Sequence, residues 1–370
     1  MKRIPLLIPD LPTHTRLATY LSRIDANRWY ANFGPLVREL ETRLAQTFAT
    51  AGTSGAQVVS VANATLGLEL ALLAHSLPAG SRILVPALTF VASAAFIVRA
   101  GHIPVLCDVD SDTWLLTPEL SRSLALKSRA AAVMPVSTYG CPQQAEAWDR
   151  FADETGIPVV LDAAGAFETQ GRTGRSCAVF SLHATKTLGA GEGGFIVSTD
   201  ARLLERMRVL ANFGIEPETG LVEQAGTNAK LSEYHAAVAL AGLDDWDSIR
   251  KRRIDLHHRY IEALSRLCPV ARLQKRPPDG VYSILPVLLP DSVDSVSIGT
   301  QLATRGIETR RWYCPTLDRH PAFASFPVAG ELRVSALLNE RLLAIPFHVF
   351  LSDEEIEIVC KELNRAISRG

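Results

Sequence analysis

Apolar segments of strand length alternate with helix-forming runs from about residue 57 to residue 240 of this chain. The segments Gln57–Val61, Arg82–Pro86 and 103–109 are short, rich in aliphatic residues and bounded by Gly, Pro or charged residues. Near-continuous apolar strands separated by helices indicate a mostly parallel sheet covered on both faces. The pattern therefore predicts an α/β fold. Two further segments, 130–136 and 157–164, continue the series.

The character of the sequence changes in its last third, which indicates more than one domain. A chain of 370 residues exceeds the size at which a single core usually stops growing. We predict a large domain over residues 1–243, a connecting helix over the charged stretch 244–268, and a smaller α+β domain over residues 269–370.

Two local patterns support elements in the smaller domain. The apolar segment 281–288 predicts a strand. Ser352, with Glu355 three residues later, matches a capping box and predicts the start of the last helix.

Composition argues against several other classes of protein. Lys and Arg number 38 and Asp and Glu number 39, so no overall field attracts nucleic acid or an anionic membrane. The six cysteines form no CxxC pair and the nine histidines show no metal-binding spacing, so we expect buried thiols and no metal site. The apolar start of the chain is too short for a signal peptide, and no window reaches the ~18 uncharged apolar residues of a spanning helix. We therefore predict a cytoplasmic protein that binds neither nucleic acid nor membrane.

Two charged residues stand at the ends of predicted strands. Lys186 lies in segment 180–194, where a strand runs into a glycine-rich turn, and Asp162 ends an apolar strand. Ligands of open α/β sheets bind at the carboxyl ends of strands. Pyridoxal phosphate requires an amine that forms a Schiff base and an acid that keeps the pyridine nitrogen protonated. Either residue alone is more simply a loop residue or a cap, but the pair predicts a site for this cofactor.

Short fragments along nearly the whole chain carry a resemblance to a known family. Each fragment is weak alone, and the specificity comes from their order and spacing. They are residues 29–35, 63–65, 86–93, 135–140, 212–214, 226–233, 309–313 and 345–346, together with the segments that hold Asp162 and Lys186. The chain thereby resembles the DegT/DnrJ/StrS family of nucleotide-sugar aminotransferases. The resemblance implies fold type I of the pyridoxal-phosphate-dependent transferases, with a mostly parallel seven-stranded sheet in the large domain and a smaller α+β C-terminal domain.

The resemblance gives Lys186 and Asp162 the catalytic roles. Lys186 is expected to bind the cofactor as a Schiff base and then to move a proton between substrate and cofactor, which requires a depressed pKa. Asp162 is expected to pair with the pyridinium nitrogen.

The resemblance also implies the remaining cofactor contacts. Ala64 and Thr65 open a helix directly after a strand, where free N–H groups and the helix dipole bind phosphate. Ser181 matches a serine that also bonds the phosphate, and Phe90 matches the aromatic residue that stacks on the pyridine ring. Asn228 matches an asparagine that reaches the phosphate from the neighbouring subunit, so a homodimer with shared active sites is expected.

The chain departs from the family pattern beside Asp162. The family usually carries Gln, Glu or His at the position of Gly165, where the side chain contacts the phenolic oxygen of the cofactor. A glycine cannot make this contact. Phe167 also replaces a residue that is commonly small or polar.

The remaining expectations concern the substrate. His183 resembles the histidine that precedes the lysine in members acting at C4 of a 4-keto-6-deoxy sugar; its alternative role is simple packing. Lys230, Arg311 and Tyr313 are further candidates for substrate binding, with Lys230 and Arg311 considered for the diphosphate.

These features predict transfer of an amino group from L-glutamate to a 4-keto-6-deoxyhexose linked to dTDP, UDP or GDP. The product, a 4-amino-4,6-dideoxyhexose nucleotide, would serve surface polysaccharide or glycoside biosynthesis. The alternatives are an aminotransferase that acts at C3 or on an inosose, and a non-catalytic regulatory or sensor protein on the same scaffold.

Overall fold

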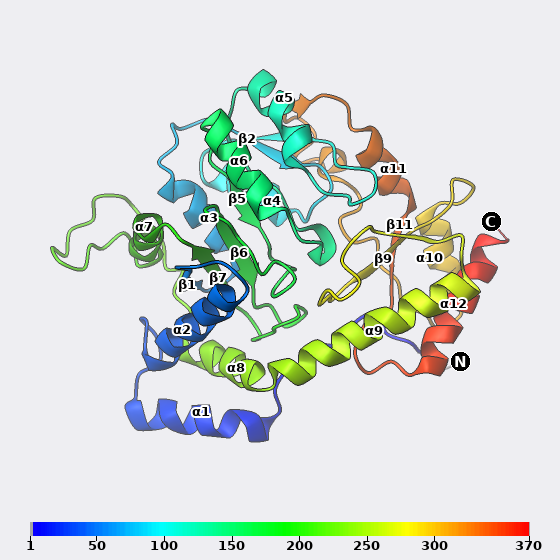
Figure 1. Ribbon diagram of the computed structural model, residues 1–370, viewed down its shortest axis with the longest axis horizontal. Coiled ribbons are helices and arrows are strands. Elements are labelled where there is room, and N and C mark those ends of the chain that lie inside the picture. The colour runs from blue at the N-terminus through cyan, green and yellow to red at the C-terminus, as the bar shows by residue number, and fades with distance from the viewer. Residues whose placement is uncertain (1–2, 370) are drawn as a thin grey trace.

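The computed structural model describes residues 3–369 and shows a central layer of strands between helices (Figure 1). The strands of this layer are β1 (Gln57–Val61), β2 (Arg82–Pro86), β3 (Ile103–Cys107), β4 (Ala130–Val133), β5 (Val160–Asp162), β6 (Cys177–Ser181), β7 (Gly194–Ser198) and β10 (Val328–Ala329). They form two sheets of four, in the orders β1–β7–β6–β5 and β10–β3–β2–β4. Isolated parallel bridges pair Val133 with Val159 and Val136 with Asp162, so the two sheets meet where β4 and β5 lie side by side.

Most strand pairs in this layer are parallel. β2 pairs in parallel with β3 and β4, β5 with β6, and β3 with β10. β7 runs antiparallel to both of its neighbours, β1 and β6. The predicted α/β fold with a mostly parallel sheet is therefore confirmed. The short strand β10 comes from the C-terminal third of the chain, so this region also contributes to the central layer.

Helices pack against both faces of the layer and bury several cores, two of which lie on opposite faces of β6 and β7. On one side the aromatic side chains of Phe180 and Phe195 pack with residues of α2 and α8, whereas on the other side Val179 and Ile196 pack with residues of α3 and α7. The alternation arises because successive side chains of a strand point to opposite faces. The helices of this part are α1 (His14–Asn27), α2 (Pro35–Thr50), α3 (Ala64–Ala74), α4 (Ala92–Arg99), α5 (Pro118–Ser128), α6 (Ala145–Thr155), α7 (Ala201–Ala211) and α8 (Glu233–Asp244).

The C-terminal part is built on a long helix and a small antiparallel sheet. Most of the charged stretch 244–268 forms one helix, α9 (Trp246–Leu267), which runs through the lower right of the molecule in Figure 1. The sheet has the order β11–β9–β8, and its strands are β8 (Arg272–Leu273), β9 (Leu285–Leu288) and β11 (Leu342–Ile345). The helices are α10 (Ser295–Thr304), α11 (Arg333–Arg341) and α12 (Asp353–Ile367). The capping box of Ser352 and Glu355 at the start of α12 is confirmed.

The segment 281–288 differs from its prediction. Only Leu285–Leu288 forms strand β9, and residues 281–284 run as an irregular segment before it. The residues ahead of the strand are apolar for another reason: Val281 and Tyr282 are buried, and Ile284 lines a cavity described below.

All six cysteines are free, and all are buried except the half-buried Cys314. Within residues 3–369 there is no group of three His, Cys, Asp or Glu side chains placed to hold a metal ion. No helix in the same range is long and apolar enough to cross a membrane.

A close backbone approach joins the central layer to the start of α3. Gly194 begins β7 and lies opposite Val61 and Ser181 in its two neighbouring strands. A Cβ atom at Gly194 would lie 2.7 Å from the amide nitrogen of Ala64 and 2.9 Å from the carbonyl oxygen of Phe180. Because both are backbone atoms, a side chain here could be accommodated only by moving the helix start.

We expect Gly194→Ala to reduce the free energy of unfolding by ~1–3 kcal/mol, the usual range for an overpacked site. Denaturant unfolding measures the change. Gly299→Ala in α10 is the matched control, because its new Cβ would meet the side-chain atoms Thr309 Oγ1 at 3.1 Å and Leu343 Cδ1 at 3.6 Å. Equal losses in the two variants would show that the backbone approach at Gly194 does not constrain the fold.

Candidate functional site

A cavity of about 260 Å³ lies at the carboxyl ends of β5 and β6 and at the start of α3. Its volume of about 260 Å³ lies just below the ~300–1,000 Å³ that is typical of small-molecule pockets. The wall brings together most of the site residues that the sequence predicts: Ala64, Thr65, Phe90, Asp162, Ser181, His183, Lys186 and Tyr313.

Asp162 and Lys186 occupy this cavity together. Asp162 is the last residue of β5 and is buried, while Lys186 follows β6 in a turn held by the hydrogen bond from its backbone N to the His183 carbonyl oxygen at 2.8 Å. Loss of hydration lowers the pKa of Lys186, and the charge of Asp162 opposes this effect. Burial raises the pKa of Asp162, although a hydrogen bond from Ser93 favours its ionised form. The amine therefore has the depressed pKa that a proton-transferring lysine needs.

The Asp162 carboxylate is oriented by a residue for which the sequence analysis gave no role. Ser93 Oγ donates to Asp162 Oδ2 at 2.8 Å, and the backbone N of Ala164 donates to Oδ1 at 3.1 Å. Thr89 and Ser93 are themselves joined by a hydroxyl–hydroxyl bond of 2.8 Å. Both residues lie in the fragment 86–93, but only the fold shows that α4 brings Ser93 to the end of β5.

Hydrogen-bond donors gather at the start of α3. Asn63 caps this helix, and its side chain accepts a hydrogen bond from the backbone N of Leu66 at 2.9 Å. The first N–H groups of a helix have no acceptor within the helix and form its positive end. In α3 these are the N–H groups of Ala64 and Thr65. Ser181 adds a hydroxyl to the same cavity. The arrangement suits a phosphate group.

Aromatic residues form another part of the wall. Phe90 has 51% of its side chain exposed although it lines the cavity. Tyr313 stacks on Tyr139 with ring centroids 4.7 Å apart, and the Tyr139 hydroxyl donates to the Trp312 carbonyl oxygen at 2.7 Å. Tyr139 and Tyr313 both have left-handed backbone, with φ of 57° and 65°. Such strained positions cluster at functional sites.

His183 lies at the exposed rim of the cavity. Its Nδ1 is 2.9 Å from Thr185 Oγ1, and its Nε2 is 3.8 Å from a carboxylate oxygen of Glu192. Thr185 and Glu192 also line the cavity. The imidazole is therefore held in place with its edge near an acid, and this environment differs from that of a packed core histidine.

Three predicted residues do not line the cavity of their own chain. Arg311 donates from Nε to Ser295 Oγ at 2.8 Å and also to the Asn339 carbonyl oxygen, so its guanidinium serves the C-terminal part. Lys230 lies over the ring of Phe213, 4.5 Å from its centroid. Asn228 is exposed and pairs with Asn212 in an isolated bridge.

The two departures from the family pattern have different structural settings. At Gly165, a Cβ would meet only the Gly140 backbone nitrogen, at 3.7 Å, which is ordinary contact. Packing therefore does not require a glycine at this position in the cavity wall. Phe167 belongs to the core, where its ring packs against those of Phe48, Phe195 and Trp246.

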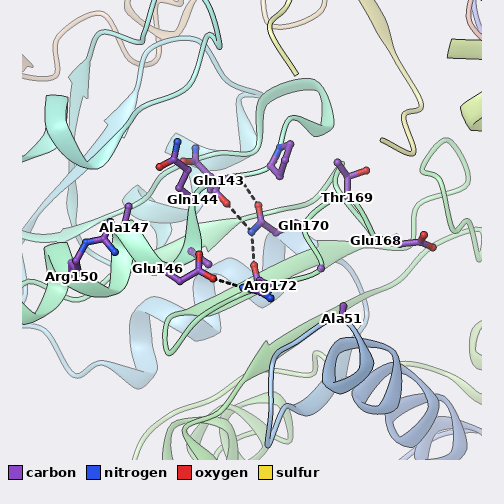
Figure 2. Close-up of a pocket in the computed structure, with 13 residues that line it drawn as sticks. Ala51, Gln143, Gln144, Glu146, Ala147, Arg150, Glu168, Thr169, Gln170 and Arg172 are labelled. Atoms are coloured by element: carbon purple, nitrogen blue, oxygen red, sulfur yellow. Dashed lines mark hydrogen bonds and ion pairs between the residues drawn. The ribbon is translucent and has the colours of Figure 1, made fainter. Parts of the chain in front are cut away.

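A second hollow, of about 640 Å³, lies on the surface beside α6 (Figure 2). Figure 2 shows the residues of this hollow bonded to one another: the Gln170 side chain donates to the backbone carbonyl oxygen of Gln143 at 3.1 Å, and Arg172 pairs with Glu146 at 2.9 Å. Gln170 Oε1 also accepts a hydrogen bond from Ser137 Oγ at 3.3 Å. Ser137 lines the cavity, so these glutamines support the cavity wall from behind.

The residues of the cavity fit pyridoxal phosphate. Within residues 3–369, Asp162 has no ion-pair partner, and a buried carboxylate of this kind fits a protonated ring nitrogen. The amine of Lys186, the exposed ring of Phe90 and the donors at the start of α3 match the aldehyde, ring and phosphate of the cofactor.

Comparison with known proteins identifies the family. The model of the DegT/DnrJ/EryC1/StrS aminotransferase family matches residues 13–364. The chain belongs to this family. Membership confirms that it is a pyridoxal-phosphate-dependent enzyme of the sugar aminotransferase class.

Relatives cover nearly the whole chain. EryC1 of Saccharopolyspora erythraea, described as an erythromycin biosynthesis sensory transduction protein, is 32% identical over 92% of each chain. A dTDP-4-amino-4,6-dideoxy-D-glucose transaminase of Escherichia coli is 28% identical over 98% of each chain. A crystal structure of DesI in the presence of its TDP-sugar product has a TM-score of 0.89 and 31% identity, and the match covers 100% of this chain and 94% of DesI.

The bond from Ser93 to Asp162 gives a prediction for this aminotransferase. Ser93→Ala removes a donor that favours the ionised carboxylate, so the pKa of Asp162 should rise. Because the ionised form is the one that stabilises a protonated ring nitrogen, the acid limb of the reaction with L-glutamate should move to higher pH, by ~1 unit. The measurement is the rate at which L-glutamate changes the visible absorbance of the cofactor-loaded protein, recorded across a range of pH.

Ser137→Ala is the control, because its hydroxyl bonds Gln170 and not Asp162. An unchanged acid limb in Ser93→Ala would contradict this role of Ser93.

Proposed function

We propose that this enzyme transfers an amino group from L-glutamate to C4 of a nucleotide-linked 4-keto-6-deoxyhexose. The observation that carries the proposal is the presence of Lys186 and Asp162 in one cavity with donors for a phosphate group. When bound, pyridoxal phosphate supplies an electron sink for the carbon that gains or loses the amine. Each residue around the cofactor then has a definable task.

Lys186 would hold the cofactor and afterwards act as the base that moves a proton at the reacting carbon. Its lowered pKa leaves a larger share of the amine neutral, as this task requires. Asp162 would hold the ring nitrogen in its protonated form. The start of α3 and Ser181 would bind the phosphate, and Phe90 would cover a face of the ring.

The substrate assignment rests on His183 and on the relatives. His183 stands at the rim beside Thr185 and Glu192, where a sugar would enter. The Escherichia coli relative is described as a transaminase that forms a 4-amino-4,6-dideoxy sugar nucleotide, and DesI was crystallised with a TDP-sugar product. The name of the Escherichia coli relative favours action at C4 over the alternatives, C3 or an inosose, and the DesI title favours a nucleotide-linked sugar. The nucleotide and the biosynthetic pathway served, together with the predicted cytoplasmic location, remain parts of this proposal.

A sensor or regulatory protein is the second candidate. The description of EryC1 as a sensory transduction protein favours it. A protein that only binds a ligand has no need for a lysine with a depressed pKa beside a buried carboxylate. The presence of this pair therefore favours an enzyme.

Lys186→Ala tests the catalytic assignment. The parent protein loaded with cofactor should lose its visible absorbance on addition of L-glutamate and should convert one of a panel of UDP-, dTDP- and GDP-linked 4-keto sugars, with products identified by NMR. The variant should lose at least ~10²–10⁴-fold in rate, because covalent attachment and proton transfer are removed together. Turnover by Lys186→Ala at the parent rate would falsify the role of Lys186.

We also propose that two copies share their active sites. Asn228 lies on the segment 213–228 after α7, which extends away from the body of the molecule in Figure 1. This segment exposes large apolar side chains, among them Phe213, Leu221 and Val222, with 49%, 64% and 55% of their surface accessible. An exposed apolar projection of this kind favours contact with another chain, and a two-fold axis would place each Asn228 at the partner site.

Mixed dimers test this arrangement. A Lys186→Ala chain paired with an Asn228→Ala chain has one site with both lesions and one site with neither, so activity should return to roughly half that of the parent. Asn228→Ala alone should be weak, since a hydrogen bond to a charged group contributes ~1.5–3 kcal/mol. Verified heterodimers that stay as inactive as the two folded homodimers would exclude shared sites.

A further inference from the structure

The proposed substrates carry negatively charged oxygen groups, but no arginine is among the described residues that line the cavity. L-Glutamate has two carboxylates and a nucleotide sugar has a diphosphate. Among the described residues of the wall, only Lys186 and His183 can carry positive charge, and Lys186 is committed to the cofactor. The wall also contains the carboxylates of Asp162 and Glu192. An oxyanion at the mouth of the cavity therefore needs a cation from a neighbouring position.

Arg310 occupies such a position. Its guanidinium carbon lies 4.0 Å from the centroid of the Trp312 ring, and Trp312 lines the cavity. The side chain of Arg310 is exposed, and within residues 3–369 it makes no ion pair and no side-chain hydrogen bond. Several other exposed arginines are also unpaired, but no other arginine in this range lies over a residue of the cavity wall.

The backbone around Arg310 is fixed although its guanidinium is free. Its N donates to the Ala344 carbonyl oxygen at 3.1 Å, and the N of Ala344 donates back to the Arg310 carbonyl oxygen at 2.8 Å. The Trp312 carbonyl oxygen accepts from the Tyr139 hydroxyl at 2.7 Å. The backbone of Arg310 is therefore fixed by β11, and the backbone of Trp312 is fixed by Tyr139, which follows β4. A guanidinium that stacks on an aromatic face keeps its N–H donors available for a planar, bidentate oxyanion.

We propose that Arg310, presented on the ring of Trp312, binds an oxyanion of the substrate at the mouth of the cavity. The chemistry is that of a carboxylate of the amino donor or of the diphosphate of the sugar nucleotide, both of which suit a guanidinium fork. This inference rests on the proposed function for the identity of these ligands. Arg310 takes the place of Arg311, a candidate that the sequence offered together with Lys230, because the guanidinium of Arg311 is already bonded to Ser295 and Asn339.

Binding of two probes to the cofactor-loaded protein tests the proposal. Glutarate stands for the dicarboxylate donor and inorganic pyrophosphate for the diphosphate, and calorimetry measures both without turnover. Arg310→Met should lower the affinity for the probe that Arg310 binds by ~10- to 100-fold, which is the loss expected when one charge-assisted hydrogen bond is removed. Arg310→Lys should give an intermediate loss, because it keeps the charge but not the fork.

Arg333→Met in α11 is the matched control, since among residues 3–369 the Arg333 guanidinium pairs only with the neighbouring exposed Glu331. It should bind both probes within about twofold of the parent, as expected for a surface charge. Loss of glutarate alone assigns Arg310 to the donor, loss of pyrophosphate alone assigns it to the nucleotide, and loss of both makes it a common oxyanion site. The KM should rise for the substrate whose probe loses affinity and stay unchanged for the other.

Three results would overturn the proposal: parent-like affinity of Arg310→Met for both probes, equal losses in Arg310→Met and Arg333→Met, or no probe binding by the parent. Circular dichroism and the visible absorbance of the cofactor establish that each variant is folded and loaded. Binding that depends on Arg310, in a protein that transaminates no sugar of the panel, would count against the proposed function and leave the Arg310 site standing.

Discussion

The site depends on one buried charge that forms no ion pair within residues 3–369, the carboxylate of Asp162. Asp162 is 5% exposed, and within residues 3–369 its carboxylate accepts two hydrogen bonds, from the Ser93 hydroxyl and from the backbone N of Ala164. A buried ion that forms no ion pair is costly, and burial raises the pKa of this group although the charge of Lys186 opposes the rise. A cationic ligand is the natural way to offset the cost. The pyridinium nitrogen of the cofactor supplies such a charge, so the same feature that weakens the empty fold strengthens cofactor binding.

The position of Asp162 follows from the meeting of the two sheets. Its backbone N donates to the Pro135 carbonyl oxygen at 2.9 Å, and its carbonyl oxygen accepts from the N of Ser137 at 2.8 Å. These bonds tie the end of β5 to the segment after β4, where regular pairing of the two sheets gives way to isolated bridges. The opening between strand ends is where ligands bind in open α/β sheets. Gln170, which accepts from Ser137, braces this opening from the surface hollow of Figure 2.

The sequence predicts what local patterns encode. Asp162 ends one predicted strand and Lys186 follows the end of another. In a parallel sheet the ends of both strands lie at the same edge, so the sequence predicts that these two residues lie close together. Ser93 and Trp312 carry no such signal, because their importance comes from contacts with residues 69 and 173 positions away. The segment 281–284 shows the same limit. Its apolar residues read as a strand, yet they are buried as part of the cavity wall and its support. Arg310 and Arg311 are adjacent in sequence, and only the fold shows which guanidinium is already used.

The paired tyrosines connect the formation of the cavity to the docking of the C-terminal part. Left-handed backbone costs roughly 1–2 kcal/mol for a residue with a side chain, and both Tyr139 and Tyr313 adopt it. Tyr139 follows β4, whereas Tyr313 precedes η2 (Leu317–Arg319) in the C-terminal part. Neither conformation is favourable alone, so each depends on the stacking of the two rings and on the bond from Tyr139 to Trp312. Tyr313 and Trp312 therefore reach the cavity only when the two parts are joined. A substrate-binding wall made from both parts is consequently complete only in the assembled fold.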